Sequence, residues 1–158
     1  MTTLRHTWLS SCYSMPRRIL TVLVTLCLAI GAMAQSDADR IVGTYKAKLS
    51  HNDAKIKVFK YQDGYRMQIC WLKEPNEANG SPKLDKKNPD KSKRSNPMTQ
   101  VVLIDKVTYE KGIWKNGIIY DPKGGRTYKV ELKLEGQQLE VKGKLGPFHK
   151  CMYWTKIQ

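Results

Sequence analysis

Residues 114–128 read Trp-Lys-Asn-Gly-Ile-Ile-Tyr-Asp-Pro-Lys-Gly-Gly-Arg-Thr-Tyr, and this stretch decides the fold class. Aromatic and β-branched residues, which favour strands, stand on both sides of a reversal at residues 121–124. In that reversal Asp121 supplies an Asx acceptor, Pro122 presets φ, and the following glycines can take φ > 0. The stretch therefore predicts two antiparallel strands joined by a tight turn, and it identifies no chemistry.

Apolar and polar residues alternate with period two along the rest of the chain, and no segment keeps a helical period over three turns. About eight short strands joined mainly by tight turns predict an all-β domain, an antiparallel meander that closes into a small barrel. A closed barrel would place the first strand, near Tyr45, beside the last strand, near Trp154. A sandwich of two sheets is the alternative architecture.

One hairpin allows the strand register to be predicted. The dipeptide Asp-Gly at residues 63–64 is typical of a two-residue turn, which would pair Val58 with Ile69 and Ile56 with Trp71. This pairing gathers the apolar residues on one face of the hairpin. Two aromatic residues of the second strand then fall on the outer face, so either they form an exposed patch or a bulge shifts the register.

The first 34 residues have the features of a secretory signal peptide. Three arginines precede an apolar segment at residues 19–30, and Ala32-Met33-Ala34 offers a small-residue cleavage site. The apolar segment is shorter than the roughly 20 residues of a spanning helix. We therefore expect a cleaved leader and a periplasmic or secreted location, with a retained anchor as the alternative. The mature chain, residues 35–158, would be one domain without a membrane span, carrying a long proline-containing loop at about residues 73–98.

The chain is strongly basic. Its formal net charge of +14 falls to +11 in the mature chain, because the leader carries three arginines and no acidic residue. A field of this sign favours polyanions, so an anionic envelope component is a candidate partner. However, the lysines and arginines are spread along the whole mature chain, which is typical of a solvated sheet face. An exported protein rarely meets nucleic acid, so we do not expect nucleic acid as a partner, and we expect a monomer.

Cysteine and histidine give little evidence of a chemical site. Only Cys70 and Cys151 remain after processing, and they could form a disulfide in an oxidising compartment if the fold brings them within reach. The mature histidines, His51 and His149, lack the spacing of zinc ligands. We therefore expect neither a metal nor a cofactor.

A series of short motifs spans most of the mature chain: Gly43-Thr44-Tyr45, Cys70-Trp71-Leu72, Asp85, Asn88-Pro89, Arg94, Pro97, Trp114, residues 117–122, Gly125, Tyr128, residues 139–143, Gly146 and Trp154. Together they resemble the bacterial exported family called domain of unknown function 2147. Two positions depart from the family pattern, since Tyr45 stands where tryptophan is usual and Gln100 where glycine is common. The resemblance implies a small extracytoplasmic barrel similar to lipocalin-like folds, and it implies no established activity.

The candidate site residues are polar groups of the loop and the turn, together with aromatics that could line an interior. Binding residues usually lie on loops that a rigid scaffold positions. Asp85 and Arg94 could pair to pin the long loop over the barrel mouth or could meet a ligand, Asp121 could be a turn acceptor, and the aromatics could be core. The candidate ligand-binding set is Trp71, Asp85, Arg94, Trp114, Tyr120, Asp121 and Tyr128.

No catalytic motif is present: the sequence contains neither a Gly-x-Ser-x-Gly elbow nor a phosphate-binding loop. We assign no catalytic residue and regard an enzyme as the least favoured class. The sequence favours a binding module for a small, partly apolar ligand, held between the long loop and the turn at residues 120–122. The alternative is a surface interaction protein that binds an acidic envelope partner through its basic face.

Overall fold

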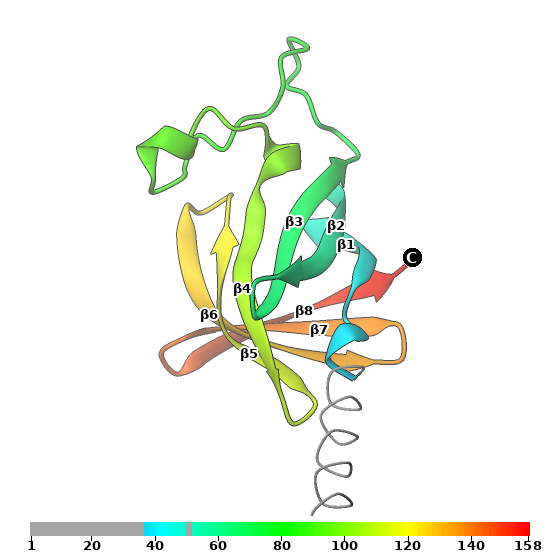
Figure 1. Cartoon of the computed structure of the whole chain (residues 1–158). Coiled ribbons are helices and arrows are strands. Elements are labelled where there is room, and N and C mark those ends of the chain that lie inside the picture. The colour runs from blue at the N-terminus through cyan, green and yellow to red at the C-terminus, as the bar shows by residue number, and fades with distance from the viewer. Residues whose placement is uncertain (1–36, 50–51) are drawn as a thin grey trace, which may run out of the picture. The chain divides into compact units, whose positions relative to one another are not determined.

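The computed structural model describes residues 37–49 and 52–158, so the expected signal peptide lies outside the described residues. Each strand pairs antiparallel with the next, and β1 pairs with β8, which closes the barrel (Figure 1). The strands are β1 (Gly43–Leu49), β2 (Asn52–Tyr61), β3 (Gly64–Leu72), β4 (Val102–Glu110), β5 (Ile113–Asp121), β6 (Arg126–Glu135), β7 (Gln138–Leu145) and β8 (Phe148–Lys156). The prediction of an eight-stranded antiparallel barrel is confirmed.

The seam between the first and last strands carries the closure. Tyr45 pairs with Lys156 and Lys46 with Thr155, which confirms the expected neighbourhood of the two strands. Inward-facing side chains fill much of the interior, and the largest of them, Trp154 and Tyr45, are at most 1% exposed. Two short 3-10 segments, η1 (Lys91–Lys93) and η2 (Met98–Gln100), lie in the long loop. No helix in the described part of the chain is long and apolar enough to cross a bilayer.

The β2–β3 hairpin differs from its predicted register. Tyr61 pairs with Gly64, and Val58 pairs with Met67 instead of Ile69, so the turn residues are 62 and 63. The reason is that glycine is needed inside β3: a Cβ atom on Gly64 would overlap the carbonyl oxygen of Val107 on β4. Gly64 therefore serves the close approach of two strands and not the turn.

A bulge in β3 corrects the predicted placement of Trp71. Ile56 pairs with Ile69 while its neighbour Lys55 pairs with Trp71, so Cys70 is the extra residue in β3. The bulge turns the Trp71 side chain to the outer face, where it is 42% exposed and Lys55 Nζ lies 5.4 Å from its ring centroid. A bulge reverses the alternation of side chains beyond it, which explains the outward position.

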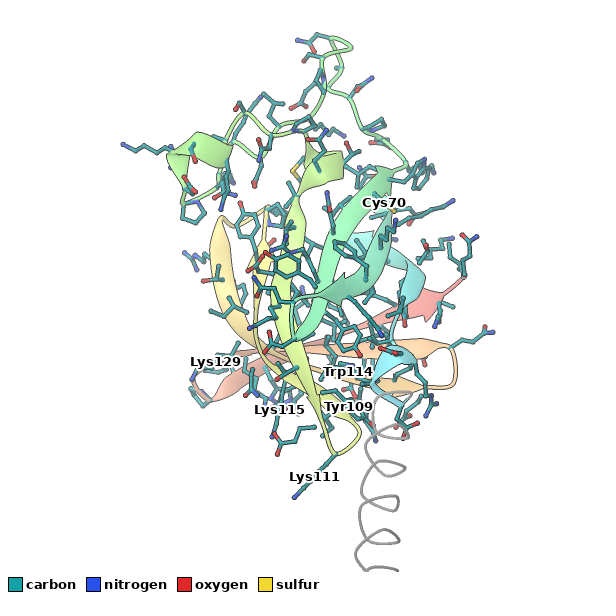
Figure 2. All side chains as sticks on the ribbon, in the orientation of Figure 1. Cys70, Tyr109, Lys111, Trp114, Lys115 and Lys129 are labelled. Carbon is teal, nitrogen blue, oxygen red and sulfur yellow. The ribbon has the colours of Figure 1, made fainter. Side chains whose placement is uncertain are left out.

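One end of the barrel is filled by side chains and covered by the segment at residues 37–41. Trp114 donates from Nε1 to the Ala38 carbonyl oxygen at 3.1 Å, and the Tyr45 hydroxyl donates to the Ile41 carbonyl oxygen at 2.8 Å. Trp114 also packs on Tyr109, with ring centroids 4.9 Å apart (Figure 2). Trp114 is thus a core residue, 3% exposed, that anchors the N-terminal segment.

The two cysteines are free, so the disulfide that the sequence allowed is not formed. Cys70 lies on β3 and Cys151 on β8, and β1 and β2 stand between these strands in the barrel order. Cys70 occupies the bulge and donates from Sγ to the Lys55 carbonyl oxygen at 3.3 Å (Figure 2). A hydrogen bond with Glu140 raises the pKa of the Cys151 thiol.

Candidate functional site

A cavity of about 960 Å³ lies at the other end of the barrel, where β4, β6 and β8 begin and the long loop crosses the mouth. This volume is near the top of the range of about 300–1,000 Å³ that is usual for small-molecule sites. The main apolar lining residues are Met98, Leu103, Ile119, Tyr128, Met152 and Trp154. The charged lining residues are Lys48, Glu74, Lys83, Asp121, Lys123 and Lys150.

One wall of the cavity is the inner face of β8. Alternation along the strand places Lys150, Met152 and Trp154 on the same face, with Trp154 deepest, since it is 1% exposed and near the strand's far end. Gly143 of β7 lies directly opposite Lys150. A Cβ atom on Gly143 would have its nearest neighbours at 3.9 Å. The glycine therefore lines the cavity at a point where a Cβ atom would fit in ordinary contact with its neighbours.

The Trp154 side chain, which lines the floor of the cavity, has a hydrogen-bond donor that the described residues leave without a partner. Trp154 Nε1 is buried, and it has no acceptor among the described residues. Buried tryptophan N–H groups usually find a partner, because an unsatisfied buried donor costs about 1–3 kcal/mol. The Trp154 indole lines the cavity, but its Nε1 atom has less than 1 Å² of accessible surface, so the N–H does not face the open space.

The long loop is held over the mouth by a buried carboxylate. Asp85, 2% exposed, accepts from the Tyr120 hydroxyl and from Asn88 Nδ2, each at 2.6 Å. Arg94 Nε donates to the Asn88 carbonyl oxygen at 2.7 Å. We call Asp85, Asn88, Arg94 and Tyr120 the loop clamp. Because hydrogen bonds to a charged group are about twice as strong as neutral ones, the clamp ties the loop firmly to β5.

The loop has a second attachment on the β5–β6 turn. Gly125 has φ of 65°, and a Cβ atom there would overlap the Lys87 carbonyl oxygen of the loop. Lys87 Nζ donates to the Lys123 carbonyl oxygen at 3.0 Å. Within the turn, Asp121 Oδ1 accepts from the Lys123 backbone N–H at 3.0 Å, which is the Asx-turn role considered from the sequence. The turn and the loop therefore fit together through their backbones.

The structure brings part of the candidate set together. Tyr120, Asp121 and Tyr128 line the cavity, while Asp85 and Arg94 stand behind Tyr120 in the loop clamp. The other two candidates, Trp71 on the outer face and Trp114 in the filled end, are not among the residues that line it.

The hydrogen bonds of the loop clamp also differ from the expected pairing of Asp85 with Arg94. Arg94 does not pair with Asp85 in the described structure; its Nε donates to the backbone of Asn88 instead. The buried carboxylate of Asp85 has two neutral partners. Its Oδ1 accepts a hydrogen bond from the Tyr120 hydroxyl, and its Oδ2 accepts one from the Asn88 side-chain amide. Both aspartates of the candidate set thus serve structural hydrogen bonds. Among the residues described, no cluster of three His, Cys, Asp or Glu side chains could hold a metal ion.

Sequence reasoning left Lys150 and Gly143 out of the candidate set. Both face the cavity because Leu145 pairs with Phe148 across a Gly146 turn, which fixes which residues of β7 and β8 point inward. Extending the alternation backward from Trp154 would have found Lys150. Nothing in the sequence shows that Gly143 lines a cavity, because its neighbours Ile119 and Tyr128 come from other strands.

Three tyrosine hydroxyls held in hydrogen bonds give a pH prediction. Burial raises the pKa of Tyr45 to about 12 from the ordinary value of 10.0. Burial first, and then a carboxylate partner, also raise the pKa values of Tyr65 and Tyr120. Above pH 10.0 the unfolded chain therefore loses these protons before the folded chain does. We expect the free energy of unfolding, measured with denaturant, to fall as the pH rises from 10.0 to about 12.

The tyrosinate absorbance provides the check on this pH dependence. It should rise together with unfolding for the three tyrosines, and Tyr45→Phe should reduce the loss of stability over the same pH interval. Ionisation of all tyrosines near pH 10.0 with the barrel still folded would contradict the expectation.

Comparison with known proteins supports the fold and supplies no activity. The family model described as an uncharacterised protein conserved in bacteria (DUF2147) matches residues 43–156. The barrel is similar to the solved structure of a Helicobacter pylori protein that is described as belonging to the lipocalin family. That match has a TM-score of 0.61 and 22% identity, covering 75% of this chain and 83% of the other, so it shows the fold alone. A comparison with curated proteins found no match.

Proposed function

We propose that this chain, which belongs to the DUF2147 family, is a binding module for a small, partly apolar ligand. The proposal is based on the geometry of its own barrel. The ligand would enter at the mouth between the long loop and the β5–β6 turn. There it would lie against Tyr120 and Tyr128, with Met152 and Trp154 deeper in the barrel.

The observation that carries this proposal is a cavity of about 960 Å³ with an apolar wall that includes the Trp154 indole. A barrel of eight strands is just wide enough either to be filled by side chains or to hold one small ligand. Here the end near Trp114 is filled, whereas the other end holds the cavity, with Gly143 in its lining. The same small-ligand role suits the lipocalin-like architecture.

Substitution of Gly143 tests the proposal. Gly143→Leu adds a side chain at a position that lines the cavity, where the new Cβ has ordinary contacts at 3.9 Å. We expect the neutral fluorescent probe N-phenylnaphthylamine to bind the unchanged protein with increased emission. Gly143→Ala should weaken that binding, and Gly143→Leu should abolish it.

Gly136→Ala is the matched control, because Gly136 lies in the open β6–β7 turn and nothing lies within 4 Å of its added Cβ. Its probe affinity should equal that of the unchanged protein. The thermal midpoint of Gly143→Leu is measured alongside, to check that the barrel remains folded. Equal probe binding by the folded Gly143→Leu protein would overturn the proposed function.

A second candidate function uses the outer face. Lys46 of β1 stands directly opposite Lys55 of β2, and like charges in such cross-strand positions destabilise a sheet. An acidic polymer or anionic lipid surface would relieve this repulsion and could contact the exposed Trp71 beneath Lys55. This function predicts binding to anionic vesicles that falls steeply with salt and is lost when Lys46 and Lys55 are both changed to Gln. Salt-insensitive binding would count against it.

We also propose that the protein is exported after removal of its first 34 residues. The support is the order of basic, apolar and small residues in that segment. The protein isolated from the envelope fraction of its host should begin at Gln35, as N-terminal sequencing can determine. A chain that retains its first residues would contradict this.

A further inference from the structure

The last strand of the barrel is paired on one side only over most of its length. β8 spans Phe148–Lys156, and β7 pairs with it from Phe148 to Thr155. On its other side β1 pairs with it at Thr155 and Lys156, and no other described residue pairs with that side. In Figure 1, β8 runs from the β7–β8 turn toward the end marked C, and it meets β1 near that end. Residues 148–154 therefore form an open edge, which we call the β8 edge.

The β8 edge presents backbone groups that have no partner strand in the described part of the chain. Leu145 pairs with Phe148 across a two-residue turn, so Phe148 and every second residue after it form hydrogen bonds with β7. The end of the strand agrees with this phase, because the Ile157 N–H donates to the Thr44 carbonyl oxygen of β1. The residues of the β8 edge that turn their N–H and C=O groups to the β1 side are thus His149, Cys151 and Tyr153.

We propose that the β8 edge binds an extended, acidic segment of another protein, which adds a strand to the sheet beside β8. An exposed strand edge is a template for such addition. In this mode of recognition, backbone hydrogen bonds provide affinity and alternate side chains provide specificity. The proposal adds a polypeptide partner to the small-ligand function and does not depend on it.

The charge beside the β8 edge favours an acidic partner over a second copy of the chain. Lys48 of β1 and Lys150 of β8 are exposed, and both line the cavity where these two strands part. None of the ion pairs in the described ranges includes either lysine. Lysines on an edge strand oppose pairing with a like edge, and the chain has a formal net charge of +14. An acidic strand would meet attraction at the same place.

The alternation of side chains along β8 specifies the order of residues in the partner. Directly opposite side chains of an antiparallel pair lie on the same face, with Cβ atoms about 5 Å apart. Lys150 and Met152 both lie on the inner face of β8. An acidic residue suits the position opposite Lys150, and an apolar residue suits the position opposite Met152. Because the partner runs in the reverse direction, its apolar residue comes two positions before its acidic residue.

Amide hydrogen exchange, followed by NMR and corrected for intrinsic rates, tests whether the edge is open. In the free protein the amides of Cys151 and Tyr153 should exchange at least tenfold faster than those of Lys150 and Met152, which bond to β7. The peptide Ac-Thr-Ile-Thr-Glu-Thr-amide should protect the two fast amides at saturation. Equal protection of all four amides in the free, monomeric protein would overturn the proposal.

Altered peptides test the pairing itself. Ac-Thr-Glu-Thr-Ile-Thr-amide has the same composition in reverse order, and it should bind about fivefold more weakly because the acid then lies opposite Met152. N-methylation of the central threonine removes the N–H that pairs with Cys151, so it should weaken binding about tenfold. N-methylation of the isoleucine, whose N–H points away from β8, is the matched control. Equal binding of all four peptides would show that no antiparallel strand forms.

A charge exchange assigns the acidic preference to one residue. Lys150→Glu should weaken binding of the glutamate peptide about fivefold and should favour the same peptide with lysine in place of glutamate. Lys129→Glu makes the same change in net charge on β6, which is paired on both sides, and should leave the preference unchanged (Figure 2). An unchanged preference in Lys150→Glu would overturn the acidic class. Protection of the Cys151 amide that rises with protein concentration would identify a second copy as the occupant and overturn the proposed partner.

Discussion

Asp85→Asn should open the long loop, and Asn88→Asp in the same chain should close it again. In the loop clamp, the Asp85 carboxylate faces the Asn88 amide at 2.6 Å and the Tyr120 hydroxyl at 2.6 Å. An asparagine at position 85 can still accept from Tyr120, but its amide group then meets the Asn88 amide donor to donor. Leaving these buried groups unsatisfied should cost about 2 kcal/mol, or roughly a thirtyfold rise in the open fraction of the loop.

Trypsin provides the measurement, because the loop carries several lysines around the clamp. When opening and closing are fast, the rate of cleavage follows the population of the open form. Cleavage between residues 83 and 94 should therefore accelerate about thirtyfold in Asp85→Asn. The single change Asn88→Asp should accelerate it further, since it places two carboxylates face to face in a buried site.

The double variant makes the clamp prediction specific. Exchanging the two residues restores one carboxylate and one amide at the same contact, so the cleavage rate should return close to that of the unchanged protein. A double-mutant cycle should then give a coupling energy above about 1 kcal/mol between the two positions, as expected for residues in one hydrogen-bond network. Additive effects of the two changes would show that Asp85 and Asn88 do not hold the loop together.

Gly125→Ala should detach the loop at its other contact with the β5–β6 turn. Alanine at a φ of 65° costs about 1–2 kcal/mol by itself, and its Cβ would also overlap the Lys87 carbonyl oxygen. Both terms act in the same direction, and together they should lower the free energy of unfolding by about 3 kcal/mol. Faster amide exchange should appear at Lys87 and Asn88 in the same variant.

Gly136→Ala provides the comparison for this backbone effect. Gly136 has φ of 58°, nearly the value at Gly125, but an added Cβ meets nothing within 4 Å. It should lose only the conformational part, about 1–2 kcal/mol, and should leave amide exchange in the loop unchanged. Equal destabilisation by the two alanines would mean that the loop does not press against the turn.

The architecture could be predicted from the sequence because its evidence is local. Alternation with period two and turn residues at regular intervals indicate strands whatever their partners are. The register of the β2–β3 hairpin could not be predicted. Gly64 lies where β4 approaches closely, and the contact that excludes a side chain there comes from Val107, far along the chain. The bulge at Cys70 has the same character, because it becomes visible only when both paired strands are placed.

The candidate site was predictable in part for a related reason. Residues close in sequence to the β5–β6 turn, Tyr120 and Asp121, could be identified from the turn itself, and they do line the cavity. Trp71 and Trp114 are aromatic, like several of the lining residues, yet neither lines the cavity. A bulge turns Trp71 to the outer face, and a hydrogen bond to the Ala38 carbonyl oxygen holds Trp114 in the filled end. Aromatic character alone does not distinguish a cavity wall from a core.

The seam between β1 and β8 has a consequence for the order of events during synthesis. The barrel closes only when Tyr45 of β1 pairs with Lys156 of β8, and these residues lie near opposite ends of the domain's sequence. At about 5–20 residues per second, a ribosome takes about 6–22 s to proceed from Tyr45 to Lys156. Throughout that time the nascent chain lacks its last strand and keeps the edges of its unfinished sheet unpaired. Completion of this fold therefore requires that β8 has been made.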